Sequence, residues 1–140
     1  MERALSDMET VFRALADATR LRILGLLATG EVCVCHIHEA LKISQPKASR
    51  HLAYLRRTGL VATRRDGLWI HYRMADLPDA VLVVVQQTVM HALTHMTAVR
   101  KDVERLNQRT GCCLPEPSGK SFSCCDTSTR PSSKASAALR

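Results

Sequence analysis

Two short segments rich in β-branched and aromatic residues, 61–65 and 68–74, are separated only by Asp66 and Gly67. An Asp-Gly pair suits a two-residue primed turn, because both central residues of that turn need a positive backbone φ. The pattern therefore predicts a β-hairpin. In the other patterned segments the apolar residues recur at the spacing of a helix. The chain is therefore limited to mainly helical folds that carry a small sheet.

Five segments are predicted to be helices because their apolar residues recur at intervals of three and four. They cover residues 5–15, 17–29, 33–42, 44–58 and 78–107. Asp17 and Ser44 are the expected N-caps of the second and fourth helices, and a Thr-Gly pair ends each of the two. Four apolar residues of the first helix share one face: Leu5, Met8, Phe12 and Leu15.

The last helix, 78–107, would be on the order of 45 Å long at 1.5 Å per residue. Its apolar positions keep the three-four spacing throughout, and a domain of this size cannot cover such a length. The free apolar seam therefore predicts a homodimer built on this helix, with the first helix packed alongside.

Three helices followed by a hairpin, with a tight turn at Ile43 and Ser44, is the order of a winged helix-turn-helix. We therefore expect a mainly α fold with a β-hairpin wing that dimerises through its terminal helices. The periodicity stops near residue 110, and the stretch 111–140 holds seven Ser and three of the five Pro. The expected organisation is a DNA-binding and dimerisation domain, 1–110, followed by a disordered tail, 111–140.

The charge distribution indicates a polyanionic partner. Twenty Lys and Arg against thirteen Asp and Glu leave a net charge of +7. Seven of the basic residues and a single acidic one lie between residues 44 and 73. On the fourth helix three apolar residues are expected to point inward: Ala48, Leu52 and Leu55. This places Lys47, Arg50 and Tyr54 on the opposite side, which can enter a major groove.

The candidate DNA contacts lie at the start of the fourth helix and in the wing. They are Ser44, Gln45, Lys47, Ser49, Arg50, His51, Arg64 and Arg65. Gln45 can pair with the edge of adenine, whereas Arg64 and Arg65 are expected to grip the phosphate backbone. A dimer would place two such helices roughly 34 to 36 Å apart, which predicts double-stranded operator DNA with an inverted repeat. The alternative for any one of these basic residues is a merely solvated position.

The chain shows no feature of a membrane or exported protein. Its longest purely apolar run, 80–85, is far shorter than the roughly 20 residues that cross a membrane, and residues 1–6 carry no apolar signal region. We therefore expect a cytoplasmic protein with no membrane partner, in which clustered cysteines bind metals or do redox chemistry. An enzyme is not expected, because no Ser/His/Asp arrangement, phosphate-binding loop or carboxylate pair stands out.

Four motifs, in the same order, resemble the ArsR/SmtB family of metal-responsive repressors. They are Ala16-Asp-Ala-Thr-Arg20, Glu31-Val-Cys-Val-Cys35, Ser44-Gln-Pro-Lys-Ala-Ser-Arg-His-Leu52 and Asp66-Gly-Leu-Trp-Ile-His-Tyr-Arg73. The resemblance covers residues 5–107 and is strongest to the arsenite-responsive ArsR branch. It implies a winged-helix homodimer that represses an arsenic-resistance operon and holds no permanent cofactor. It also implies release from the operator when the inducer, As(III) or Sb(III), binds cysteine thiolates.

Cys33 and Cys35 are the main candidate ligands for that inducer. They lie at the start of the third predicted helix, where the helix dipole favours thiolates, and soft ions prefer thiolates. Side chains two apart on a regular helix point about 200° away from each other, so one ion can bind both sulfurs only if that turn unwinds. Unwinding would misplace Lys47 and Arg50 on the next helix, which predicts a release mechanism.

The identity of the third ligand stays open at this point. His38 stands where the family's best-known members carry a third cysteine, and an imidazole suits As(III) poorly. The alternatives are an exogenous thiol, no third ligand, or a thiol of the tail, which has two vicinal pairs: Cys112, Cys113, Cys124 and Cys125. His36 together with His38 keeps Zn(II) or Cd(II) open. His91 and His95 lack the carboxylates of a zinc-sensing pattern, so we expect surface or interface histidines.

Two other functions are alternatives. The same fold could sense Zn(II), Cd(II) or thiol oxidation. A thiol-redox or metal-sequestering protein belongs to another class. The chain disfavours a thiol-redox enzyme because neither a Cys-x-x-Cys motif nor a single activated Cys at a strand-to-helix loop is expected.

Overall fold

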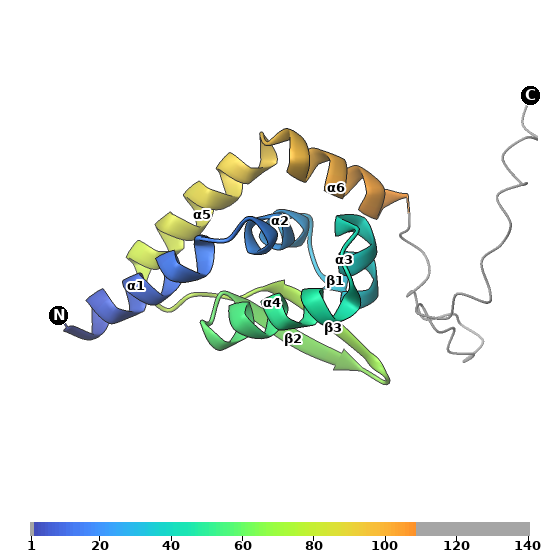
Figure 1. Cartoon of the computed structure of the whole chain (residues 1–140). Coiled ribbons are helices and arrows are strands. Elements are labelled where there is room, and N and C mark those ends of the chain that lie inside the picture. The colour runs from blue at the N-terminus through green and yellow to red at the C-terminus, as the bar shows by residue number, and fades with distance from the viewer. Residues whose placement is uncertain (1, 109–140) are drawn as a thin grey trace, which may run out of the picture. The chain divides into compact units, whose positions relative to one another are not determined.

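The computed structural model describes residues 2–108 (Figure 1). The elements are α1 Glu2–Leu15, α2 Ala18–Leu27, β1 Val32–Cys33, α3 Val34–Leu41, α4 Gln45–Arg57, β2 Val61–Asp66, β3 Trp69–Met74, α5 Ala80–Thr94 and α6 Thr97–Asn107. The predicted winged helix-turn-helix is confirmed, with α3 and α4 as the helix-turn-helix and the β2–β3 hairpin as the wing. The predicted tail, 111–140, with its four cysteines lies outside the described residues. Within residues 2–108, no helix has the length and apolar character needed to span a membrane.

The wing belongs to a three-stranded antiparallel sheet in the order β1-β3-β2. Strands β2 and β3 pair along their whole length, and Gly67 takes the positive φ, 59°, that the predicted turn needs. Strand β1 adds only two residues and places Cys33 opposite His71. A strand this short has no alternation of its own, so the sequence pattern did not predict it.

The N-caps predicted for α2 and α4 are confirmed by side-chain hydrogen bonds. The Asp17 carboxylate accepts from the backbone N–H of Arg20 at 3.0 Å. Ser44 Oγ accepts from the backbone N–H of Lys47 at 3.3 Å. Between the two helices of the motif, Lys42 ends α3 with a left-handed φ of 55°. The chain therefore turns directly from α3 into α4, and the start of α4 follows the position of α3.

The single long helix predicted over 78–107 is wrong. Helices α5 and α6 are separate, with Met96 between them in extended backbone, at φ −80° and ψ 129°. Helix α6 packs back on α2 and α3. There Val99 lies so close to Gly25 that a Cβ atom on residue 25 would be 2.4 Å from Val99 Cγ1. Both helices bury apolar residues, so the three-four spacing runs on across the bend and conceals it.

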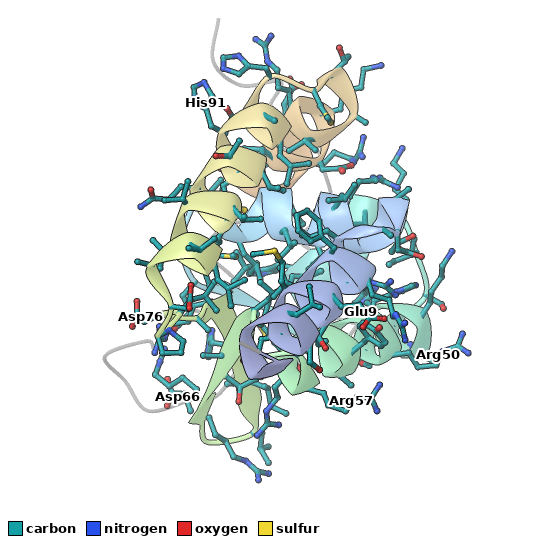
Figure 2. All side chains as sticks on the ribbon, turned by 90° about the vertical axis from the view of Figure 1, so that its left-hand side faces the viewer. Glu9, Arg50, Arg57, Asp66, Asp76 and His91 are labelled. Atoms are coloured by element: carbon teal, nitrogen blue, oxygen red, sulfur yellow. The ribbon has the colours of Figure 1, made fainter. Side chains whose placement is uncertain are left out.

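Only part of the apolar face predicted for α1 packs against the core, where Met8 and Leu15 are partly buried. Val11 is buried, whereas Leu5 and Phe12 are 72% and 52% exposed. On α5, Val81 and Val84 are also exposed. Both helices lie on the same side of the domain (Figures 1 and 2). That side therefore presents apolar side chains of two helices to solvent.

Candidate nucleic-acid interface and thiol pair

Helix α4 presents polar and basic side chains opposite its buried face. The three inward positions are fully buried, as predicted: Ala48, Leu52 and Leu55. The candidate contacts on the first turns are exposed: Ser44, Gln45, Lys47, Ser49 and Arg50. Figure 2 shows Arg50 and Arg57 extending away from the ribbon. The outer side of α4 can therefore approach a polyanion without rearrangement.

Two residues expected on this surface contact the protein instead. Tyr54 is half-buried, and the Arg20 guanidinium lies 4.3 Å from its ring centroid. The predicted outward position of Tyr54 is therefore wrong, because the ring packs beneath Arg20 and against the core. His51 is half-buried too, with Nδ1 3.8 Å from the Asp17 carboxylate. The backbone N–H of Arg20 holds the pKa of Asp17 below its ordinary value, so this carboxylate is ionised at neutral pH.

Arg64 and Arg65 are exposed on the wing, as phosphate contacts must be. Arg64 Nε donates to Glu31 Oε1 at 3.0 Å, and this hydrogen bond lowers the pKa of Glu31. Arg65 Nε donates to the backbone oxygen of Gly67 at 3.3 Å. Glu31 lies outside the basic segment 44–73, so counting charge along the sequence missed a carboxylate that the fold places beside the wing.

The thiols of Cys33 and Cys35 lie together, with their Sγ atoms 3.1 Å apart. Both residues are buried, at 2% and 1% exposure. The predicted divergence of the two side chains is wrong, because Cys33 is the last residue of β1 and the N-cap of α3, with extended backbone at φ −72° and ψ 146°. The angle between side chains on a regular helix does not apply to a residue that precedes the helix.

The sulfur positions suit one soft ion. Two metal–sulfur bonds of about 2.3 Å that meet near the tetrahedral angle hold their sulfurs about 3.8 Å apart. The sulfurs of this pair are 3.1 Å apart, so they need only a small separation to bind one ion. The first turn of α3 does not have to unwind.

The surroundings of Cys33 favour its thiolate. The hydrogen bond with Cys35 lowers the pKa of Cys33 from 9.0 to about 7, and the backbone N–H groups of Cys35 and Val34 act in the same direction against the effect of burial. The lowered pKa therefore favours the thiolate of Cys33 near neutral pH, where a thiol with an unshifted pKa is almost fully protonated. The ionised sulfur is the form that binds a soft ion.

We predict that the thiolate of Cys33, followed by its ultraviolet absorbance, forms as the pH rises with a midpoint of about 7. In the Cys35→Ala variant the midpoint should move up toward 9.0, because the largest contribution to the lowered pKa is removed. Subtracting the absorbance of the matching Cys33→Ser protein separates Cys33 from the other cysteines. A wild-type midpoint near 9, or no change in the variant, would show that Cys35 does not tune Cys33.

Histidines do not complete a metal site among the described residues. His38 is half-buried, and within residues 2–108 no group of three or more His, Cys, Asp or Glu is arranged to hold a metal ion. His91 and His95 are exposed on or next to α5, with ring centroids 4.9 Å apart. The structure therefore brings together Cys33 and Cys35, and it does not add His38 to them.

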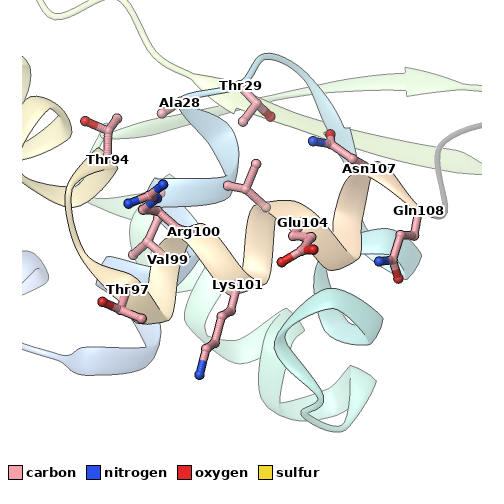
Figure 3. A pocket seen from close by; sticks show the side chains of 12 residues that line it. Ala28, Thr29, Thr94, Thr97, Val99, Arg100, Lys101, Glu104, Asn107 and Gln108 are labelled. Atoms are coloured by element: carbon pink, nitrogen blue, oxygen red, sulfur yellow. The ribbon is translucent and has the colours of Figure 1, made fainter.

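A separate hollow of about 790 Å³ lies between α2 and α6, next to the bend that precedes α6 (Figure 3). Its charged lining residues are Arg100, Lys101 and Glu104, and no Cys or His lines it. This hollow is therefore not part of the thiol site.

Comparison with known proteins matches this chain to one family. Residues 17–63 match the model "Bacterial regulatory protein, arsR family". The chain is 54% identical over 99 residues to "Arsenical resistance operon repressor" of Escherichia coli K12, covering 69% of this chain and 85% of that protein. It is also 54% identical over 81 residues to "Arsenic resistance transcriptional regulator ArsR1" of Pseudomonas putida KT2440. That match covers 56% of this chain and 63%, less than two thirds, of the relative.

A solved structure supports the same assignment. The solution structure of the "homodimeric winged helix-turn-helix DNA-binding domain" of Mb0332 from Mycobacterium bovis, described as a possible ArsR-family transcriptional regulator, superposes with a TM-score of 0.55. The two sequences are 38% identical, and the match covers 68% of this chain and 86% of the Mycobacterium bovis chain. Together with the fold and the basic outer side of α4, these matches show that the chain belongs to the ArsR family of DNA-binding transcriptional regulators.

Proposed function

We propose that this protein is a homodimeric repressor of an arsenic-resistance operon that leaves its operator when As(III) or Sb(III) binds Cys33 and Cys35. The observation that carries the proposal is the pair of buried sulfurs 3.1 Å apart at the N-terminus of α3. The names of two relatives, both of which refer to arsenic resistance, support the choice of inducer.

Helix α3 is the connection between the thiols and the DNA-reading helix. The thiol pair lies at its first turn, and Lys42 at its C-terminal end turns the chain directly into α4. Because both thiols are buried, an ion can enter only if the start of α3 moves relative to its neighbours. We infer that this movement shifts α4 and misplaces Lys47 and Arg50 on the DNA.

The energy of thiolate binding is sufficient for this switch. Moving a two-state repressor from 1% to 99% released takes about 5.5 kcal/mol of differential affinity. Structural thiolate sites for zinc reach on the order of 10 kcal/mol or more. At roughly 3 kcal/mol for each of four ligands, two or three metal–sulfur bonds supply about 6 to 9 kcal/mol, which covers the switch and leaves up to about 3 kcal/mol to offset the loss of packing at the start of α3.

A second copy of the chain is the proposed occupant of the apolar side formed by α1 and α5. Leu5, Phe12, Val81 and Val84 expose apolar surface there, and the Mycobacterium bovis relative is described as homodimeric. Two α4 helices about one turn of DNA apart would then select an inverted repeat, with Gln45, Lys47 and Arg50 as base or phosphate contacts.

Fluorescence anisotropy tests this function on an operator selected by the protein from random-sequence duplexes. Arsenite should release the labelled duplex from the wild-type protein, because the bound ion stabilises the conformation with displaced α4. Cd(II), Zn(II) and hydrogen peroxide are tested in parallel. Release by one of these and not by arsenite would support the alternative effectors, and retention of DNA with arsenite would refute the proposed inducer.

The third ligand can be counted by X-ray absorption of the arsenite complex of the full chain. Three sulfurs, reduced to two by truncation after Arg109, would identify a tail thiol among Cys112, Cys113, Cys124 and Cys125. Two sulfurs in the full chain would exclude the tail. Three sulfurs in both proteins would identify an exogenous thiol.

A further inference from the structure

The guanidinium of Arg64, a proposed phosphate contact of the wing, is already occupied. Its Nε lies 3.0 Å from Glu31 Oε1 and 3.2 Å from Oε2, and its Nη2 also donates to Oε1. The remaining nitrogen, Nη1, lies 3.8 Å from Asp66 Oδ2. All three nitrogens of Arg64 therefore face a carboxylate.

The neighbouring arginine differs. Among the described residues, Arg65 Nε donates only to the backbone oxygen of Gly67, which leaves its charge without a carboxylate partner. The two wing arginines are therefore not equivalent in the free protein. Arg65 can meet a phosphate directly, whereas Arg64 must first change partners.

A DNA phosphate would compete with Glu31 for the same edge of Arg64. A guanidinium binds carboxylate and phosphate through the same pair of parallel N–H donors. Two anions placed on that edge would repel each other, so Glu31 has to leave when the phosphate arrives. The exchange is accessible, because the side chains of Arg64 and Glu31 are 53% and 28% exposed.

Glu31 also connects the wing to the thiol-bearing segment. It lies two residues before Cys33 and directly before β1. Its carboxylate is 4.0 Å from Nδ1 of His71, which is the register partner of Cys33 on the neighbouring strand. The Glu31–Arg64 pair thus joins β2 of the wing to the chain that enters β1.

We propose that Glu31 is an intramolecular competitor of DNA: it holds Arg64 in the free protein, and the wing contributes this charge to DNA binding only after Arg64 exchanges Glu31 for a phosphate. The inference rests on the DNA-binding part of the proposed function, since the wing has to contact DNA. It is independent of which inducer binds the thiols.

The test compares the full-length wild-type protein with Glu31→Gln on a fluorescein-labelled, mixed-sequence duplex. Phosphate contacts are independent of sequence, so no operator is needed. The variant should bind about two- to fivefold tighter, the effect expected from removing one exposed ion pair that opposes binding. Glu104→Gln is the matched control, because it removes the same charge from an exposed position on α6 and should leave the affinity unchanged.

A second comparison shows whether the effect passes through Arg64. Arg64→Gln should weaken binding and reduce the slope of log affinity against log salt by about 0.9. Adding Glu31→Gln to that variant should change nothing further. The proposal is overturned if Glu31→Gln binds no tighter than wild type, or if it tightens binding equally without Arg64. Failure of the wild-type protein to bind duplex DNA at any salt concentration would instead overturn the DNA-binding function itself.

Discussion

Replacing Cys33 with serine should abolish the release of operator DNA at arsenite concentrations that release it from the wild-type protein. A serine oxygen is a hard ligand and stays protonated at neutral pH, so the ion loses one of its two anchoring sulfurs. Four-ligand thiolate sites reach about 10 to 16 kcal/mol, roughly 3 kcal/mol for each bond, which corresponds to about a hundredfold in affinity. The arsenite concentration for half-release should rise by at least that factor.

Anisotropy titrations on the selected operator measure this shift. The Cys33→Ser variant should still bind the operator, because no residue of α4 or of the wing is changed. His91→Ala is the control, since it removes an exposed candidate ligand on α5 and should release DNA at wild-type arsenite concentrations. If Cys33→Ser were released as readily as wild type, the inducer would have to bind outside the thiol pair.

Local signals predicted the parts of this fold that depend on neighbouring residues. The caps of α2 and α4 need only a side chain three residues before a backbone N–H, and Asp17 and Ser44 supply it. The hairpin needs only a turn that accepts positive φ, and Gly67 supplies it. The fully buried residues of α4 follow from the helical period alone.

The features that the sequence did not predict depend on contacts between distant segments. Strand β1 exists because residues 32 and 33 pair with β3, and this pairing takes Cys33 out of α3 and brings its sulfur to Cys35. Glu31 reaches Arg64, 33 residues away in the sequence. Tyr54 lies under Arg20, which belongs to α2. These contacts join segments that are far apart in the sequence, so neither a periodicity nor a short motif reveals them. The geometry of both proposed sites is therefore visible only in the structure.

Beyond the bend between α5 and α6, a buried charge network, another contact between distant segments, joins α6 to α2 and to the end of α3. Asp102 is fully buried, and Arg22 donates to its two oxygens at 2.8 and 2.7 Å. Arg105 donates to the same carboxylate. The two arginines also donate to the carbonyls of Leu41, at 3.2 Å, and Ala40, at 2.6 Å. The network therefore fixes the C-terminal end of α3, opposite the end that carries the thiols.

Asp102→Ala should lower the free energy of unfolding by about 2 to 4 kcal/mol, because it leaves two guanidiniums without their counter-charge. The value falls below that of a fully buried pair, since Arg22 and Arg105 are 31% and 28% exposed. Urea unfolding followed by circular dichroism measures the loss. Glu104→Ala, at an exposed position of the same helix, should change stability by no more than about 0.5 kcal/mol.

A triple variant, Arg22→Met, Asp102→Leu and Arg105→Met, separates the contribution of the buried charges to stability from that of the hydrogen bonds to the α3 carbonyls. Apolar side chains of similar size can replace a buried ion pair with little loss of stability. The two carbonyls at the end of α3 would still lose their donors, so stability should recover only in part relative to Asp102→Ala. A loss below about 1 kcal/mol in Asp102→Ala would instead mean that apolar packing, such as that of Val99 on Gly25, is sufficient to hold α6 in place.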